Sequence, residues 1–154
     1  MSIEDRLHDL GLALPVPAAP VAAYVPAVEA AGLLHISGQL PFREGLLMVG
    51  RLGEDRDIGY GYDAARACGL MLIAQMKKAL GGDLERIERI VKLGVFVNST
   101  DHFTDQPKVA NGASELMEAV FGEAGRHARS AVGVPILPLG AAVEIDAIVA
   151  VRPA

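Results

Sequence analysis

The chain of 154 residues has no tryptophan, one cysteine and few aromatic side chains, which make up 5% of the residues. The single cysteine, Cys68, excludes an internal disulfide and a zinc site built from cysteines. Because Cys68 lies in an apolar, helix-like segment, we expect a buried structural thiol. Basic residues number 14 against 19 acidic ones, for a formal net charge of −5. This balance disfavours a general nucleic-acid binder, which would present a basic face.

Several motifs that carry chemistry are also missing. The sequence has no GxGxxG or Walker phosphate loop, no GxSxG motif and no CxxC pair. The four histidines lack the spacing of metal ligands, so we expect no metal site. No apolar run reaches the length of a membrane span, and the acidic N-terminus lacks the basic and apolar regions of a signal peptide. We therefore expect a soluble, cytoplasmic protein that does not bind membranes.

The residues that are present predict one domain over residues 1–154, because hydrophobic residues make up 51% of the chain. An apolar chain with few aromatic residues often hides surface in an oligomer, so subunit contacts are expected. Periodicity and capping residues predict, in order, a helix over 2–10, an extended linker over 13–20, strands over 21–28 and 33–37, a short strand over 46–49, a helix over 59–80, a strand over 91–97, a helix from Asp105 to Gly122, and two closing strands.

This order of elements predicts an α+β fold with a single mixed β-sheet. Strands that follow each helix return to the same sheet, and the two long helices cover one of its faces. The other face stays uncovered within one chain. It must meet an apolar surface, and a second subunit is the simplest choice.

The closing stretch, residues 127–151, carries the most informative charges. Arg129 opens its first strand, while Glu144 and Asp146 lie in a second, apolar strand, where unpaired charges are costly. If these strands pair as a hairpin around Pro138–Gly140, Arg129 comes level with residues near Glu144. An arginine can clamp a carboxylate and a glutamate can move protons. On composition alone, a simple cross-strand ion pair is the favoured explanation.

Three other polar positions are candidates, each with an ordinary alternative. Ser37-Gly38-Gln39 could offer a hydroxyl and backbone amides to a ligand, or form a plain turn. Tyr24 lies in a predicted short strand, where a lone tyrosine usually only packs. Asn111 lies in mid-helix, where asparagine is mildly unfavourable, although solvent exposure would also explain it.

Together these motifs resemble the RidA/YjgF/UK114 family. The resemblance rests on Tyr24 before an apolar strand, the Ser37-Gly38-Gln39 turn, Val95-Phe96-Val97, Asn111 with Val120-Phe121, Ala128-Arg129-Ser130 and Val143-Glu144-Ile145. It covers residues 20–151, and it makes residues 1–19 an additional helix and linker. That extension and a long loop over 100–108 mark a divergent, longer member.

The resemblance implies a bacillus chorismate mutase-like fold whose chains form a homotrimer through their sheets, with ligand clefts at the interfaces. It implies hydrolysis of 2-imino and 2-enamino acids to 2-keto acids and ammonia, as in a 2-iminobutanoate/2-iminopropanoate deaminase, with no cofactor. Arg129 would clamp the substrate carboxylate, and Glu144 would position or activate water. The substrate-binding residues would be Tyr24 from a neighbouring chain, Ser37, Gly38, Asn111, Phe121, Ser130 and the backbone of Ala131.

Two other functions stay open at this point. One is a non-catalytic trimer that binds small carboxylate metabolites through Arg129. The other is the endoribonuclease and translation-inhibitor activity also attached to this family, which the acidic charge disfavours. His127 could add an acid/base group beside Arg129, or lie at the rim without a role.

Overall fold

The computed structural model describes residues 1–20 and 22–154. Along the chain its elements are α1 (Ile3–Asp9), β1 (Ala27–Ala30), β2 (Leu33–Gln39), β3 (Phe42–Arg43), β4 (Leu46–Leu47), α2 (Ile58–Ala79), β5 (Ile87–Asn98), α3 (Gln106–Phe121), β6 (Ala128–Val134) and β7 (Val143–Val151). Short 3₁₀ turns occupy Leu84–Arg86, Gly122–Gly125 and Pro138–Gly140. Within the described residues, none of the helices is both long and apolar enough to cross a membrane.

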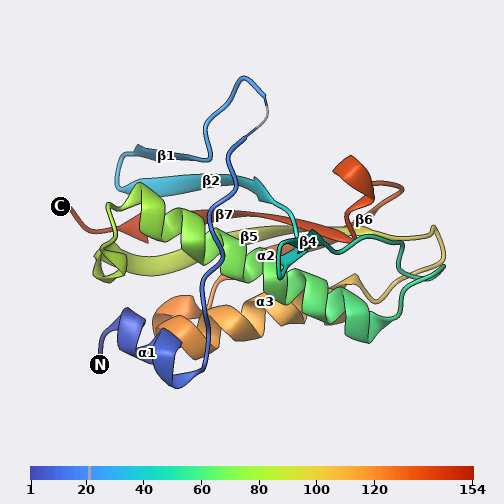
Figure 1. Ribbon diagram of the computed structural model, residues 1–154, viewed down its shortest axis with the longest axis horizontal. Coiled ribbons are helices and arrows are strands. Elements are labelled where there is room, and N and C mark those ends of the chain that lie inside the picture. Colours follow the sequence, from blue (N-terminus) through green and yellow to red (C-terminus); the bar gives the residue numbers. More distant parts are fainter. Residues whose placement is uncertain (21) are drawn as a thin grey trace.

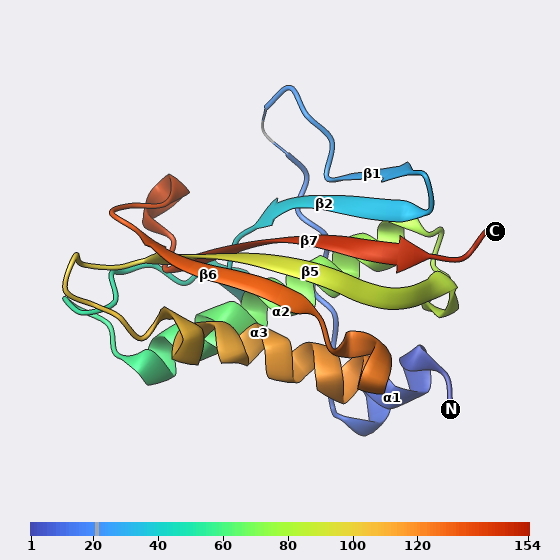
Figure 2. The same cartoon turned by 180° about the vertical axis from the view of Figure 1, so that it is seen from behind.

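Five strands form the main sheet in the order β1-β2-β7-β5-β6. The β5–β6 pair is parallel and the other pairs are antiparallel, so the sheet is mixed. Helices α2 and α3 lie against one face (Figure 1), and the view from behind shows β2, β7 and β5 with no helix in front of them (Figure 2). The predicted α+β fold with one covered face is confirmed.

The two closing strands do not form the expected hairpin. Strand β5 lies between them and pairs with both. Arg129 is therefore level with Leu93, which is itself level with Ala147, and not with Glu144. The physical reason is that α3 carries the chain back across the sheet, so that β6 starts beside β5 and runs parallel to it. The expected Arg–Glu pair is wrong for a single chain.

The long helices were predicted well because their ends carry clear signals. Asp57 caps α2 by accepting a hydrogen bond from the Tyr60 amide at 2.8 Å, and Gly81 follows the C-cap with φ +66°. Gly112 lets α3 approach α2 closely, because a Cβ there would overlap the carbonyl oxygen of Tyr62. Cys68 is fully buried in this core, as expected, and burial raises the pKa of its thiol well above the usual value.

The N-terminal third differs more from the prediction. The strand expected over 21–28 is shorter and later, since β1 begins at Ala27; Val21 lies outside the described residues. Tyr24 lies in a bend before β1 and not in a strand. Pro26 has no amide hydrogen to donate, which explains why pairing starts after it. The strand expected over 46–49 has only two residues, which pair with β3.

Candidate functional site

Arg129 projects from β6 toward α3, at the edge of the sheet. Its Nη1 donates hydrogen bonds to Asn111 Oδ1 at 2.9 Å and to Ser114 Oγ at 3.0 Å. Its Nη2 donates to the Pro107 carbonyl oxygen at 3.4 Å. The structure thus joins two predicted residues, Arg129 and Asn111. Ser114 was missed, although its place three residues after Asn111 puts both on one side of the helix.

A pocket of about 220 Å³ opens beside Arg129, lined by Ser114, Glu118, Gly125, Arg126, His127 and Arg129. Burial lowers the pKa of His127, and the positive charge of Arg129 lowers it further, against a backbone hydrogen bond with Ala128. His127 is therefore held neutral in this pocket at neutral pH. Within the described part of the chain, Arg129 forms no salt bridge.

Glu144 lies on the opposite, uncovered face of the sheet. Its carboxyl group rests on Gly38, because a Cβ built on Gly38 would be 2.9 Å from Glu144 Cδ. Gly38 and Glu144 are therefore neighbours, as two predicted site residues should be. Burial raises the pKa of Glu144, and the negative charge of Asp146 raises it further. A carboxyl group in this setting is suited to exchanging protons nearer neutral pH than an exposed one.

Asp146, two residues after Glu144 in β7, is arranged in the same way. Its carboxyl group lies over Gly94, where a Cβ would overlap it. Burial raises the pKa of Asp146, while a backbone hydrogen bond from Gly94 and the charge of Lys92 act in the opposite direction. Glycines on the neighbouring strands thus leave room for both carboxyl groups on the uncovered face.

Tyr24 and Gly38 line a pocket of about 170 Å³, together with Ala18, Ala19, Pro20, Pro26, Gln39, Leu40, Phe42 and Leu139. Ser37 donates a hydrogen bond from Oγ to the Val25 carbonyl oxygen at 2.9 Å and so fixes the bend that carries Tyr24. Tyr24, Ser37, Gly38 and Glu144 therefore belong to one neighbourhood, near the end of β2.

The remaining predicted residues lie apart. Phe121 is 9% exposed and packs in the core at the end of α3. Ala131 shares the helix-facing side of β6 with Arg129, whereas Ser130 lies on the uncovered face, level with Gly94. The site is thus divided into an arginine half, around Arg129, and a glutamate half, around Glu144, on opposite faces of the sheet.

A mixed sheet with helices on one face and charged groups on both faces places the chain in the chorismate mutase-like class of α+β proteins. A family model described as "YjgF/chorismate mutase-like, putative endoribonuclease" matches residues 4–149. The chain belongs to this family, as the sequence motifs predicted.

Known relatives carry several names. Protein TCP17 of Trypanosoma cruzi is 55% identical over 149 residues, which span 96% of this chain and 92% of that protein. A 2-iminobutanoate/2-iminopropanoate deaminase of Dermatophagoides farinae is 24% identical, over 92% of this chain and 95% of that protein. The family therefore includes proteins named as deaminases and others described as endoribonucleases.

Solved structures give the same result. A structure from Shewanella oneidensis described as a "putative endoribonuclease" superposes with a TM-score of 0.94 at 37% identity, over 98% of this chain and all of that one. Escherichia coli TdcF with bound serine superposes with a TM-score of 0.59 at 25% identity, over 90% of this chain and 94% of that one.

Proposed function

We propose that this protein hydrolyses 2-imino and 2-enamino acids to 2-keto acids and ammonia, in a cleft formed between copies of the chain. The observation that carries the proposal is the Arg129 guanidinium, which Asn111 and Ser114 hold at a small pocket. The contacts described above leave the Nε–H and one N–H of Nη2 for a ligand. Such a fork matches a carboxylate.

Glu144 supplies the second function that this reaction needs. Water adds to the imine carbon and loses a proton while the imine nitrogen gains one. The resulting carbinolamine then expels ammonia as its hydroxyl proton passes to the nitrogen and the carbonyl forms. A carboxyl group with a raised pKa can accept the first proton and return one to the nitrogen. Since the imine carbon is already electrophilic, orientation and proton transfer suffice.

The two halves of the site must come from different copies, because they face opposite sides of one sheet. A head-to-tail contact would bring the arginine half of one chain to the glutamate half of the next, and such contacts close into rings. We propose a ring of three. In support, the uncovered face carries exposed apolar side chains, among them Val28 and Val132, at 51% and 47% exposure.

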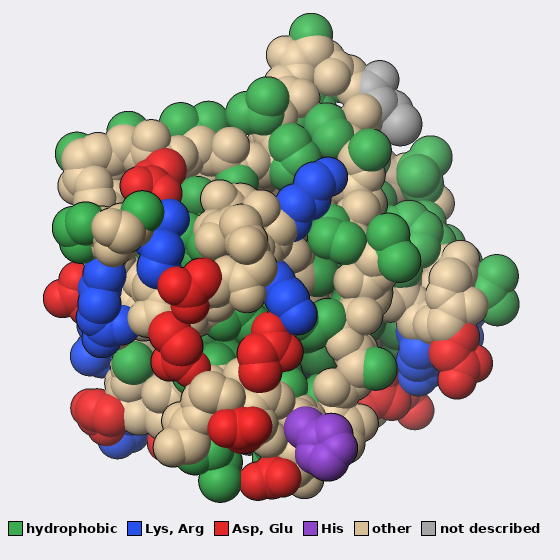
Figure 3. Space-filling model, turned by 60° about the vertical axis from the view of Figure 1, so that its left-hand side comes forward, with side chains coloured by type: hydrophobic (Ala, Val, Ile, Leu, Met, Phe, Trp, Pro, Cys, Tyr) green, Lys and Arg blue, Asp and Glu red, His purple; other side chains and the backbone are tan. Residues whose placement is uncertain are grey.

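Names within the family favour this substrate class. One relative is named as an iminoacid deaminase, and the TdcF structure holds serine, a small molecule with a carboxylate. The endoribonuclease descriptions would need contacts to a phosphate backbone. On the side shown in Figure 3, acidic and basic side chains are intermingled, and the whole chain has a formal charge of −5.

The test supplies 2-iminobutanoate generated in the assay and follows the release of ammonia and keto acid. Acceleration over spontaneous hydrolysis is expected, with strong losses in Arg129→Ala and Glu144→Gln and none in Lys78→Gln at the far end of α2. Absence of acceleration across several imino acids, with carboxylate binding retained, would instead make the protein a carboxylate binder. RNA cleavage by the purified protein that is lost in Arg129→Ala would favour the endoribonuclease.

A further inference from the structure

A third and larger pocket lies on the helix side of the sheet; it shares Ala18 and Phe42 with the pocket beside Tyr24 but is lined by neither Arg129 nor Glu144. The segment over residues 13–18, which we term the strap, follows α1 and crosses α2 in an extended form (Figure 1). Between the strap, α2 and the β3–β4 pair is a pocket of about 800 Å³, lined by Ala13, Leu14, Pro15, Val16, Ala18, Phe42, Arg43, Glu44, Gly45, Asp63, Arg66, Ala67, Leu70 and Met71.

The strap is fixed at both ends, so this pocket is part of the fold. At one end Gln75, which is 2% exposed, donates a hydrogen bond from Nε2 to the Ala18 carbonyl oxygen at 2.8 Å. Toward the other end Leu14 packs against the hydrophobic core, and α1, which precedes the strap, is joined to α2 by an ion pair between Glu4 and Lys77 at 2.7 Å. Prolines at 15 and 17 restrict the backbone between these anchors. The strap therefore cannot close on α2 without breaking contacts.

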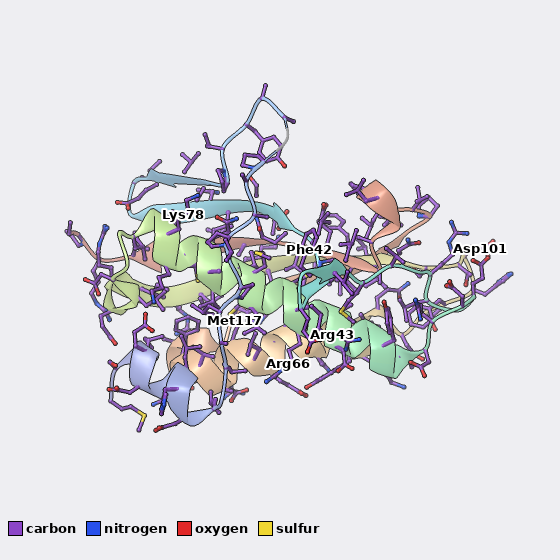
Figure 4. The ribbon with its side chains drawn as sticks, in the orientation of Figure 1. Phe42, Arg43, Arg66, Lys78, Asp101 and Met117 are labelled. Carbon is purple, nitrogen blue, oxygen red and sulfur yellow. The ribbon has the colours of Figure 1, made fainter. Side chains whose placement is uncertain are left out.

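The chemistry of the lining changes from the interior to the mouth. The interior is mostly apolar, formed by side chains of α2, the strap and Phe42. Arg43 of β3 and Arg66 of α2, labelled in Figure 4, are exposed and half-buried respectively, so they lie at the mouth of the pocket. Arg43 pairs with Asp63 at 3.8 Å. Arg66 forms no ion pair or side-chain hydrogen bond with any residue that the structure describes, which leaves a guanidinium available beside an apolar cavity.

We propose that this pocket binds an amphipathic monocarboxylate, with its apolar body under the strap and its carboxylate on Arg66. The volume suits such a ligand, since small-molecule sites commonly measure about 300–1,000 Å³. A guanidinium binds a carboxylate through parallel hydrogen bonds. Glu44 and Asp63 at the same mouth disfavour ligands with several negative charges. The site uses neither Arg129 nor Glu144, so it is independent of the proposed hydrolysis.

The test titrates the full chain with decanoate and with decan-1-ol by calorimetry. Saturable binding of one decanoate per chain is expected. Arg66→Gln should weaken decanoate binding about 10- to 100-fold, the usual effect of losing hydrogen bonds to a charged group, while leaving decan-1-ol unchanged. Lys78→Gln makes the same change in charge outside the pocket and should leave decanoate binding unchanged. Ala67→Met, which fills the pocket, should weaken both ligands.

Thermal unfolding of each variant confirms that it is folded before binding is compared. Should Arg66→Gln fail to fold, the comparison between Ala67→Met and the parent still decides whether the pocket is occupied. Decanoate affinity unchanged in both variants would overturn the proposal. Decanoate binding that is lost in Arg129→Ala would also overturn it, because the ligand would then occupy the proposed catalytic cleft.

Discussion

Replacing Asn111 by aspartate offers a sharp test of Arg129 as a carboxylate clamp. The side chain keeps its shape, and the new carboxylate lies where Asn111 Oδ1 now accepts a hydrogen bond from Arg129 Nη1 at 2.9 Å. A ligand carboxylate on the opposite side of the guanidinium would be about 6 Å away. At an effective dielectric constant of about 20, two such charges repel by about 3 kcal/mol. Screening at this half-exposed site reduces that value to about 1.5–2.5 kcal/mol.

Asn111→Asp is therefore expected to raise the KM for imino acids about 10- to 100-fold. The free energy of unfolding should not fall, because the new carboxylate gains an ion pair with Arg129. The assay is steady-state hydrolysis with calorimetric titration of a non-reactive 2-keto acid, and denaturant unfolding reports stability. Lys78→Gln, which makes the same change in net charge, is the control. An unchanged affinity for the keto acid in Asn111→Asp would refute the assignment of Arg129.

Three further predictions concern pH and packing. Folding raises the pKa of Glu144 above 4.5, the ordinary glutamate value. The contribution of Glu144 to the free energy of unfolding is therefore complete below pH 4.5 and is lost as the pH rises through the pKa of the folded state. Glu144→Gln should thus be more stable than the parent at neutral pH, and acid denaturation curves should show that this gain vanishes at low pH. Folding lowers the pKa of His127, so the parent loses stability as pH falls below 6.5, and His127→Gln should lose less in the same titration. Gly112→Ala should lower the free energy of unfolding by about 2–3 kcal/mol in denaturant experiments, because the new Cβ meets the Tyr62 backbone. Gly59→Ala, near the start of α2, should not lower it.

Local signals were sufficient to predict the helices. Ser2 forms the capping box of α1, Asp57 caps α2, and glycines follow both long helices, so their bounds agree with the prediction to within a residue or two. Such signals depend only on residues close in sequence. The turn at Gly32, with φ +77°, is local in the same way, and it joins the two strands of the β1–β2 hairpin.

The order of the strands could not be predicted from local signals. The connection through Pro138–Gly140 can join two paired strands or carry the chain past a third, and β5 decides between these by pairing on both sides. The faces of Arg129 and Glu144 depend on that choice. Family motifs identified both residues, but their separation onto opposite faces came only from the register.

Asp146 shows a second limit. The alternation along its strand showed that Asp146 shares a face with Glu144. Gly94, which leaves space for the carboxyl group of Asp146, is distant in sequence and was not identified. The pocket under the strap was missed for the same reason. The prolines over residues 13–20 predicted an extended segment correctly, but nothing local showed that it would cross α2 and be held there by a buried glutamine.

The central position of β7 has a consequence for synthesis. Among the described strands, β2 pairs with β1 and β7 alone, and β7 comes after all the others in the sequence. While the chain is still being made, the β1–β2 hairpin has no partner along its inner edge, and β5 lacks one of its neighbours. An unpaired edge of this kind invites pairing with other chains. The sheet is therefore completed only once residues 143–151 have left the ribosome, and a chain truncated before Val143 would leave both edges exposed.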